Sequence, residues 1–186
     1  MLVLLDRDGV LNENRADYVK SPAELRVIAG APEAVARLNA AGHRVVVCTQ
    51  QSCVGKGIID RAMLERIHAA LAAHLRRAGA RLDDILAATE APGDPSPRLK
   101  PRPGMLLEAM ANYRASPAET VFIGDSLRDM RAAAAAGCRR ILVRSGAGAR
   151  TQAGGLPADV LPVEVYDNLA AAVDRLLAST ENGRTP

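Results

Sequence analysis

The chain has 186 residues, of which 48% are apolar, and a formal net charge of +3 at pH 7. This length fits one domain with a sizeable core, and charges interrupt the apolar stretches before they could span a bilayer. Three cysteines without paired metal-type spacing fit a reducing compartment, so we expect a cytoplasmic protein with no membrane partner. Three Tyr, one Phe and no Trp leave few rings for stacking bases, and we expect no nucleic-acid partner.

Short apolar runs alternate with longer amphipathic stretches along the first half of the chain. This rhythm is typical of α/β proteins with a parallel sheet covered on both faces. We expect strands at 2–5, 44–48 and 85–88, and helices at 32–42 and 60–79, the second helix capped by Asp60. Residues 89–103 contain five prolines and no periodicity, which indicates a loop.

The second half continues the same alternation. We expect a helix at 103–113, a capped turn at 116–119, a strand at 120–124, a helix at 126–137, a strand at 140–143, a glycine-rich loop at 146–157, an edge strand at 160–165 and a helix at 168–178 with Asp167 as cap. The prediction is therefore a doubly wound parallel sheet, Rossmann-like, in a single domain over residues 1–178. Residues 179–186 are expected to form a disordered tail, and the protein to be a monomer.

Polar side chains follow three of the predicted strands. Asp6 and Asp8 follow the first strand, Thr49 the second, and Asp125 with Asp129 the strand at 120–124. In open parallel sheets, ligands bind beyond the carboxyl ends of the strands, where the strand order reverses. If the order is 3-2-1-4-5, Asp6 lies between Thr49 and Asp125. One such Asp would more often be an ordinary loop residue, but their joint placement predicts a site.

Three carboxylates at one edge repel each other unless a cation lies among them, and Mg²⁺ is a hard cation that shares such sites with phosphate. The pattern predicts a metal-dependent phosphoryl site. An ionised carboxylate can attack phosphorus, so Asp6 is the expected nucleophile, and Asp8 is placed to exchange protons. Gly9 permits the close turn that this placement needs.

Further residues are expected to bind the phosphate. Thr49 offers a hydroxyl, and the backbone N–H groups of Gln50, Gln51 and Ser52 follow it directly. Lys100, in the proline-rich loop, supplies a positive charge. His43, His68 and His74 have no metal-ligand spacing among them, so a packing role is the better interpretation.

These residues resemble the motifs of the haloacid dehalogenase superfamily of phosphatases. Its D-x-D-G-[TV] motif matches "DRDGV" (6–10), its Ser/Thr matches Thr49, its Lys matches Lys100, and its G-D-x-x-x-D motif matches "GDSLRD" (124–129). The resemblance implies a haloacid dehalogenase fold, Asp6 as nucleophile and Asp8 as acid/base. It also implies Mg²⁺ held by the Asp6 side chain, the Asp8 carbonyl and Asp125, with Asp129 steadying metal-bound water.

Within that superfamily, "TQQS", "KPRPGM" and "GDSLRDMRAAAAAGC" are most similar to the capless D-glycero-D-manno-heptose 1,7-bisphosphate 7-phosphatases. The resemblance implies hydrolysis of this phosphorylated sugar to the 1-phosphate, a step toward ADP-heptose for lipopolysaccharide. That group carries Cys and His zinc ligands in the loop before the Lys, but residues 89–103 here contain neither, so zinc is not expected. Leu99 replaces an Arg of the group, and Arg98 or Arg102 is expected to supply the phosphate contact instead.

Three alternatives remain open from the sequence. The same motifs fit a phosphatase for histidinol phosphate or another small metabolite. They also occur in DNA 3′-phosphatases, although these usually need a basic groove and stacking aromatics. A non-catalytic binding module is the third alternative, and the presence of every motif residue argues against it.

Overall fold

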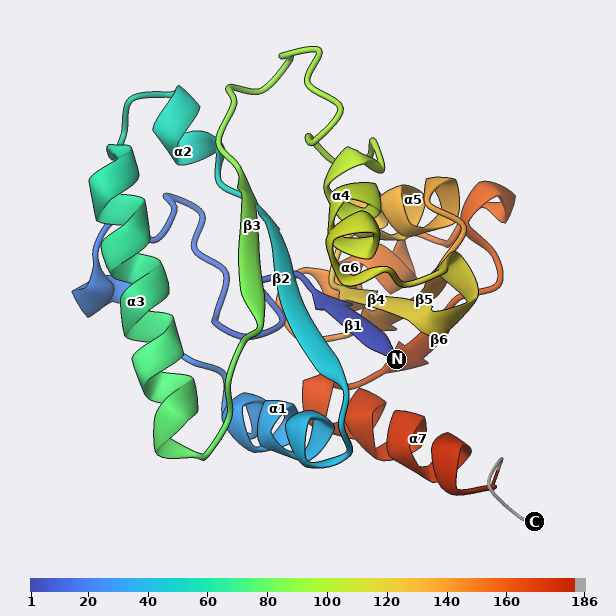
Figure 1. Cartoon of the computed structure of the whole chain (residues 1–186). Coiled ribbons are helices and arrows are strands. Elements are labelled where there is room, and N and C mark those ends of the chain that lie inside the picture. The colour runs from blue at the N-terminus through green and yellow to red at the C-terminus, as the bar shows by residue number, and fades with distance from the viewer. Residues whose placement is uncertain (183–186) are drawn as a thin grey trace.

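The computed structural model describes the backbone of residues 1–182 and the side chains of residues 1–178. Within this part, six strands form one sheet in the order β3-β2-β1-β4-β5-β6, and every adjacent pair is parallel (Figure 1). The strands are β1 (Leu2–Leu5), β2 (Arg44–Gln50), β3 (Asp84–Ala88), β4 (Thr120–Gly124), β5 (Arg139–Val143) and β6 (Glu164–Tyr166). The predicted doubly wound sheet is confirmed, with β1 between β2 and β4.

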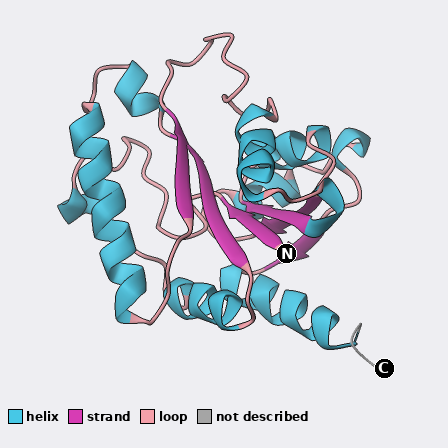
Figure 2. Cartoon of the chain, in the orientation of Figure 1, coloured by secondary structure: helices cyan, strands magenta, loops and turns pink. Residues whose placement is uncertain are grey.

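Helices cover both faces of this sheet (Figure 2). One face packs against α1 (Ala31–Ala40), α3 (Arg61–Arg77) and α7 (Leu169–Asn182), and the other against α4 (Gly104–Tyr113) and α5 (Leu127–Ala135). Successive residues of β1 point to opposite faces, so Val3 and Leu5 join the first layer while Leu2 and Leu4 join the second. Burial on both faces explains why β1 is a continuous apolar run.

Shorter elements complete the chain. They are the helices α2 (Ser52–Gly55) and α6 (Gly148–Ala153) and the 3₁₀ turns η1 (Pro22–Glu24), η2 (Pro117–Glu119) and η3 (Ala158–Val160). In Figure 1, α2 and the long loop after β3 lie at the same end of the sheet. The carboxyl ends of β1, β2 and β4 also open toward that end, because all strands run in the same direction.

Two predicted helix caps are confirmed. The Asp60 carboxylate accepts a hydrogen bond of 2.7 Å from the Met63 amide at the start of α3. Ser116 and Glu119 form the reciprocal capping box that their spacing predicts.

The cap predicted for the last helix is wrong by one residue. Asn168 accepts a hydrogen bond of 3.0 Å from the Ala171 amide, while the Asp167 carboxylate pairs with Arg144 at 2.6 Å. Asp and Asn cap helices about equally well, and in this structure Asp167 pairs with Arg144 instead. The helix extends to Asn182, beyond the predicted end at 178, and residues 183–186 of the expected tail lie outside the described residues.

The segment 146–157 is not only a loop, because six of its residues form α6. Its first turn is fixed by Asp125: the Ala147 amide donates to Asp125 Oδ2 at 2.7 Å, and the Thr151 hydroxyl donates to the Asp125 carbonyl at 3.0 Å. A tertiary contact thus overrides the weak helix propensity of a glycine-rich stretch. The last strand begins at Glu164, four residues later than predicted, and keeps the expected edge position.

The helices of residues 1–182 include none with both the length and the sustained apolarity that crossing a bilayer requires.

Candidate active site

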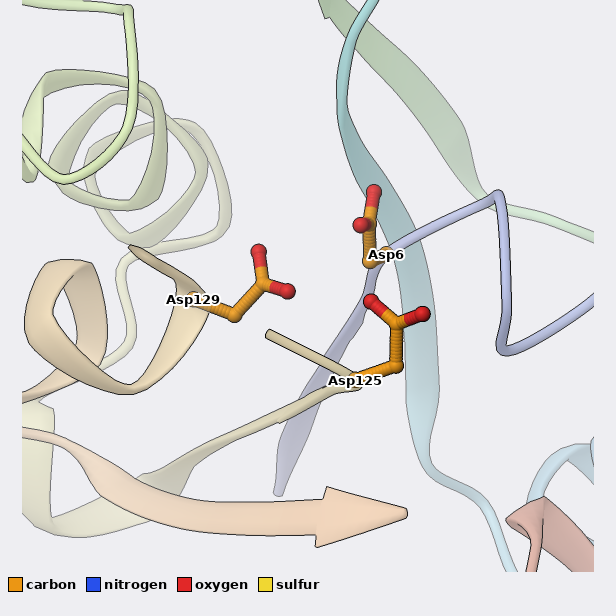
Figure 3. Close-up of side chains that lie close together, drawn as sticks. All are labelled: Asp6, Asp125 and Asp129. Atoms are coloured by element: carbon orange, nitrogen blue, oxygen red, sulfur yellow. The ribbon is translucent and has the colours of Figure 1, made fainter. Parts of the chain in front are cut away.

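Three carboxylates from three elements meet at the carboxyl edge of the sheet. Asp6 directly follows β1, Asp125 directly follows β4, and Asp129 lies in the first turn of α5. Each offers one oxygen to a group whose members lie within 4.8 Å of one another. Figure 3 shows the three side chains turned toward a shared space. This geometry agrees with the expectation that the carboxyl ends of β1 and β4 bring Asp6 and Asp125 together.

Lys100 reaches this group from the proline-rich loop. Its ammonium lies 2.7 Å from Asp129 Oδ1 and 3.1 Å from Asp6 Oδ1, and the side chain is buried. The ring of Phe122 lies beneath it, 5.1 Å from Nζ to the ring centroid. Burial disfavours the charged ammonium, but Asp129 and Asp6 outweigh that effect and raise the pKa of Lys100. Lys100 is therefore a fixed cation. We call Asp6, Lys100, Asp125 and Asp129 the strand-end cluster.

One lysine does not balance three carboxylates. Burial, followed by the charges of Asp129, Asp125 and Asp8, raises the pKa of Asp6 to about 7 in spite of Lys100. Burial and the nearby Asp129 raise the pKa of Asp125 to about 6, although hydrogen bonds from Ala147 and Asn14 oppose this. Carboxylate oxygens are the ligands that hard divalent cations prefer. The donor set and its unbalanced negative charge fit Mg²⁺.

Two glycines press directly on Asp125. Gly9 has φ of +84°, and a Cβ there would lie 2.0 Å from Asp125 Oδ2. Gly146 has φ of +60°, and its Cβ would lie 2.2 Å from the same oxygen and 2.5 Å from the Gly9 Cα. Asn14 completes this cradle by donating to Asp125 Oδ2 at 2.7 Å. The expected close turn at Gly9 is present, and its purpose is to leave room for a carboxylate from another strand.

Asp8 has the opposite electrostatic environment from Asp6. Its Oδ1 accepts from Asn12 at 2.8 Å, its Oδ2 accepts from Gln51 at 2.7 Å, and Arg7 lies 3.0 Å from both oxygens. Burial opposes ionisation of Asp8, but the Arg7 charge and these hydrogen bonds outweigh it and lower the pKa. The pKa values of two carboxyl groups two residues apart are thus shifted in opposite directions, because Asp8 is surrounded by donors whereas Asp6 faces other carboxylates.

The segment after β2 differs from the prediction. Thr49 is buried behind Gln51, whose Nε2 donates to its hydroxyl oxygen at 2.9 Å, and it does not line the cavity. The Gln51 amide donates to the Ala88 carbonyl at 2.7 Å, so it is unable to serve a phosphate. The extension of β2 to Gln50 explains the second difference, because strand pairing with β3 uses the backbone there. Gln50, Gln51 and Ser52 do line the cavity.

Neither arginine expected to replace the residue at Leu99 reaches the site. Arg98 lies 3.3 Å from Glu108, and Arg102 donates to the carbonyls of Asp94 and Ser96 at 3.0 Å each. The Arg102 bonds lie within the proline-rich loop, the Arg98 pair joins this loop to α4, and neither side chain lines the cavity. In this structure the side chains of Arg98 and Arg102 are thus directed to Glu108 and to the loop backbone rather than to the strand-end cluster.

A cavity of about 610 Å³ opens above the strand-end cluster. Its outer part carries residues that the sequence patterns did not single out, which we call the rim: Arg15, Tyr18, Arg128 and Arg150. The Lys56 ammonium donates to the Tyr18 hydroxyl at 2.8 Å, joining the two loops on one side of the cavity. Arg128 and Arg150 are exposed and make no side-chain hydrogen bond or ion pair with the described residues. Arg128 lies three residues after Asp125, inside the "GDSLRD" motif, and this position was a sign in the sequence that it could line the site.

Comparison with known proteins gives consistent findings. The HAD-hydrolase-like family model matches residues 98–172. The D-glycero-β-D-manno-heptose-1,7-bisphosphate 7-phosphatase of Bordetella bronchiseptica is 40% identical, over 95% of this chain and 97% of that protein. The enzyme with the same name from Pseudomonas aeruginosa is 39% identical, over 95% and 97%. A crystal structure of D,D-heptose 1,7-bisphosphate phosphatase from B. bronchiseptica, complexed with magnesium and phosphate, matches with a TM-score of 0.91 at 39% identity, over 96% of this chain and 98% of that chain.

Proposed function

The chain belongs to the HAD-like hydrolases and, within them, to the family of the D-glycero-β-D-manno-heptose-1,7-bisphosphate 7-phosphatases, and from this premise we propose that it hydrolyses the 7-phosphate of that sugar bisphosphate. It is a phosphoric monoester hydrolase. The observation that carries the proposal is the strand-end cluster, in which a buried lysine and three carboxylates from separate elements share one space.

In the first half-reaction, a carboxylate oxygen of Asp6 forms a bond to phosphorus. The bond between phosphorus and the sugar oxygen breaks, its electron pair stays on that oxygen, and Asp8 supplies the proton. Lys100, 3.1 Å from Asp6, is placed to offset the negative charge of both the nucleophile and the phosphoryl group. Its own contacts with Asp6 and Asp129 hold it in position before substrate binds.

In the second half-reaction, water attacks the aspartyl phosphate. The water gives its proton to Asp8, the bond between phosphorus and Asp6 breaks, and phosphate leaves. Asp8 is ionised at this point because it gave up its proton in the first half-reaction, so its carboxylate can accept this one.

The residues that would hold Mg²⁺ are Asp6 and Asp125 by their side chains and Asp8 by its carbonyl, with Asp129 supporting a bound water. The ion supplies charge neutralisation for the phosphoryl group and the carboxylates around it. Asp125 is positioned for this by Asn14, Ala147 and the two glycines that press on it.

The rim supports a second anionic group on the substrate. Arg128 and Arg150 line the same cavity as Asp6 and are exposed, so they are available to a phosphate at the far end of a bound sugar. We propose that they bind the 1-phosphate that the reaction leaves in place. The cavity volume of about 610 Å³ lies in the usual range for small-molecule sites.

We further propose that the protein acts as a single-domain monomer in the cytoplasm. All three cysteines are buried and unpaired, which suits a reducing compartment. A small sugar bisphosphate, rather than a nucleic acid, is the expected partner of a cavity with few aromatic side chains.

A substrate panel tests the proposal. Phosphate release is measured with and without Mg²⁺ on both anomers of the heptose 1,7-bisphosphate, on histidinol phosphate and on an oligonucleotide with a 3′-phosphate. We expect the highest kcat/KM on the heptose bisphosphate, with dependence on Mg²⁺. A higher kcat/KM on histidinol phosphate or the oligonucleotide would replace the proposed substrate.

A further inference from the structure

Arg7 is a buried cation that the reaction described above does not use. Its side chain is 1% exposed, and it is among the largest fully buried side chains of the described residues. A fully buried arginine is unusual in proteins unless it is paired, because its charge is removed from water. The position between Asp6 and Asp8 places this charge inside the motif that carries the chemistry.

All hydrogen bonds that the Arg7 side chain makes with the described residues come from a single nitrogen, NH2. NH2 lies 3.0 Å from each oxygen of Asp8 and 3.0 Å from Gln51 Oε1. Nε and NH1 are buried and have no hydrogen-bond partner among the described residues. Leaving buried donors unpaired costs stability, so the fold gains little from this arginine as a purely structural element.

Gln51 closes a ring of hydrogen bonds with the same two residues. Its Oε1 accepts from Arg7, and its Nε2 donates to Asp8 Oδ2 at 2.7 Å. Because Gln51 follows β2 while Arg7 and Asp8 follow β1, the ring ties the Asp8 carboxylate to a second strand. Asn12 holds the other oxygen at 2.8 Å. The carboxylate is therefore held at both oxygens, and its plane is fixed.

The backbone of Arg7 contacts the other carboxylate. Its amide donates to Asp6 Oδ1 at 2.8 Å, so the same residue orients one carboxyl group through its main chain and the next through its side chain. Proton transfer depends on the donor lying within hydrogen-bond distance of the leaving oxygen, and small displacements reduce the rate strongly.

We propose that Arg7, together with Gln51, is a positioning residue that orients Asp8 for proton transfer to the leaving oxygen. The inference rests on the proposed function, in which Asp8 is the acid/base residue. Arg7 acts through Asp8: the residue belongs to the cavity lining, but its side chain is only 1% exposed.

The test compares substrates whose leaving groups differ in their need for a proton. The alkoxide of a sugar needs one to depart, whereas p-nitrophenolate does not. The ratio kcat/KM covers the steps up to the first phosphoryl transfer, and so reports on the departure of the leaving group. We expect Arg7→Met to lower kcat/KM about 30-fold on the heptose bisphosphate and less than about 3-fold on p-nitrophenyl phosphate, since positioned proton transfer contributes about 10²–10⁴-fold.

Arg7→Lys is the conservative variant. A lysine offers three donors on one nitrogen, which matches the single nitrogen that Arg7 uses. We expect it to remain within about 5-fold of the wild type on both substrates. Arg140→Met is the matched control, because Arg140 is a partly buried arginine that bonds three carbonyls away from the cavity. It should affect both substrates equally.

Two results would overturn the inference. One is an equal loss by Arg7→Met on both substrates, and the other is Arg7→Lys being as impaired as Arg7→Met. If Arg7→Met does not fold, Gln51→Leu breaks the same ring and must show the same preference for p-nitrophenyl phosphate. If the wild type prefers another alkyl phosphate in the panel, the proposed substrate fails, but the comparison is repeated with that ester and still decides the role of Arg7.

Discussion

The strand-end cluster and the rim belong to one cavity but are built in different ways. Asp6 and Asp125 directly follow central strands, and Lys100 and Asp129 are buried with ion-pair partners. At the rim, Arg128 and Arg150 are exposed and lack such partners among the described residues, and the Tyr18 hydroxyl accepts a hydrogen bond from Lys56. In the proposed function, the chemical step belongs to groups that the sheet holds in place, and substrate choice belongs to side chains that can change without disturbing it.

The largest effect is expected at Asp6, the proposed nucleophile. Asp6→Asn should lower the rate of phosphate release by about 10³-fold or more, because an amide cannot form the aspartyl phosphate. Circular dichroism and thermal unfolding should show an intact fold, since the substitution also relieves repulsion within the strand-end cluster. Asp159→Asn, which removes an exposed ion pair with Arg131, is the matched control and should keep full activity. An active Asp6→Asn enzyme would contradict the covalent mechanism.

A smaller and more selective effect is expected at the rim. Replacing Arg128 and Arg150 together with Ala should raise KM for the bisphosphate by about 10-fold, the loss expected for about 1.4 kcal/mol of phosphate binding. KM for p-nitrophenyl phosphate, which has no second phosphate, should change by less than about 2-fold. Arg98→Ala is the control, because Arg98 pairs with Glu108 outside the cavity. Equal changes in KM on both substrates would show that the rim does not select the second phosphate.

The smallest effect concerns stability and its dependence on pH. The pKa of Asp6 is raised from 3.8 to about 7 and that of Asp125 from 3.8 to about 6. Without metal, their contribution to folding is fully present below about pH 4 and decreases as pH rises through these values. Mg²⁺ competes with the bound protons, so it should raise the unfolding midpoint by about 5 °C at pH 8 but by only about 1 °C at pH 5.

Scanning calorimetry with Mg²⁺ or a chelator measures this shift. Asp125→Asn should lose it, whereas Asp159→Asn should retain it. A shift of the same size at both pH values would mean that the ion does not replace protons on Asp6 and Asp125.

The same two regions differ in how well the sequence predicts them. β1 and β4 are continuous apolar runs buried on both faces, so their ends, and the meeting of Asp6 with Asp125, could be inferred from pattern and strand order. No comparable sequence pattern predicts the direction in which a loop side chain points. Arg98 and Arg150 are both loop-region arginines in the sequence, and only tertiary contacts decide that the first binds Glu108 while the second lines the cavity.

Dependence on tertiary contacts also explains why the sequence did not predict the helix α6 or the burial of Arg7. The six-residue helix α6 depends on hydrogen bonds from Ala147 and Thr151 to Asp125, which lies 22 and 26 residues earlier in the chain. The burial of Arg7 was hidden because charged residues are expected at the surface, and an inward direction depends on the partners that Asp8 and Gln51 provide.

The contact between Gly9 and Gly146 also limits how this enzyme can be redesigned. A methyl group added at either glycine would collide with Asp125. Both glycines also have backbone angles that other residues rarely adopt. A mutational library that randomised them would consist mostly of inactive members, whatever substrate was sought. Selection for new phosphate esters has better prospects at Arg128, Arg150 and Tyr18, where exposed or half-buried side chains can vary while the packing beneath them stays the same.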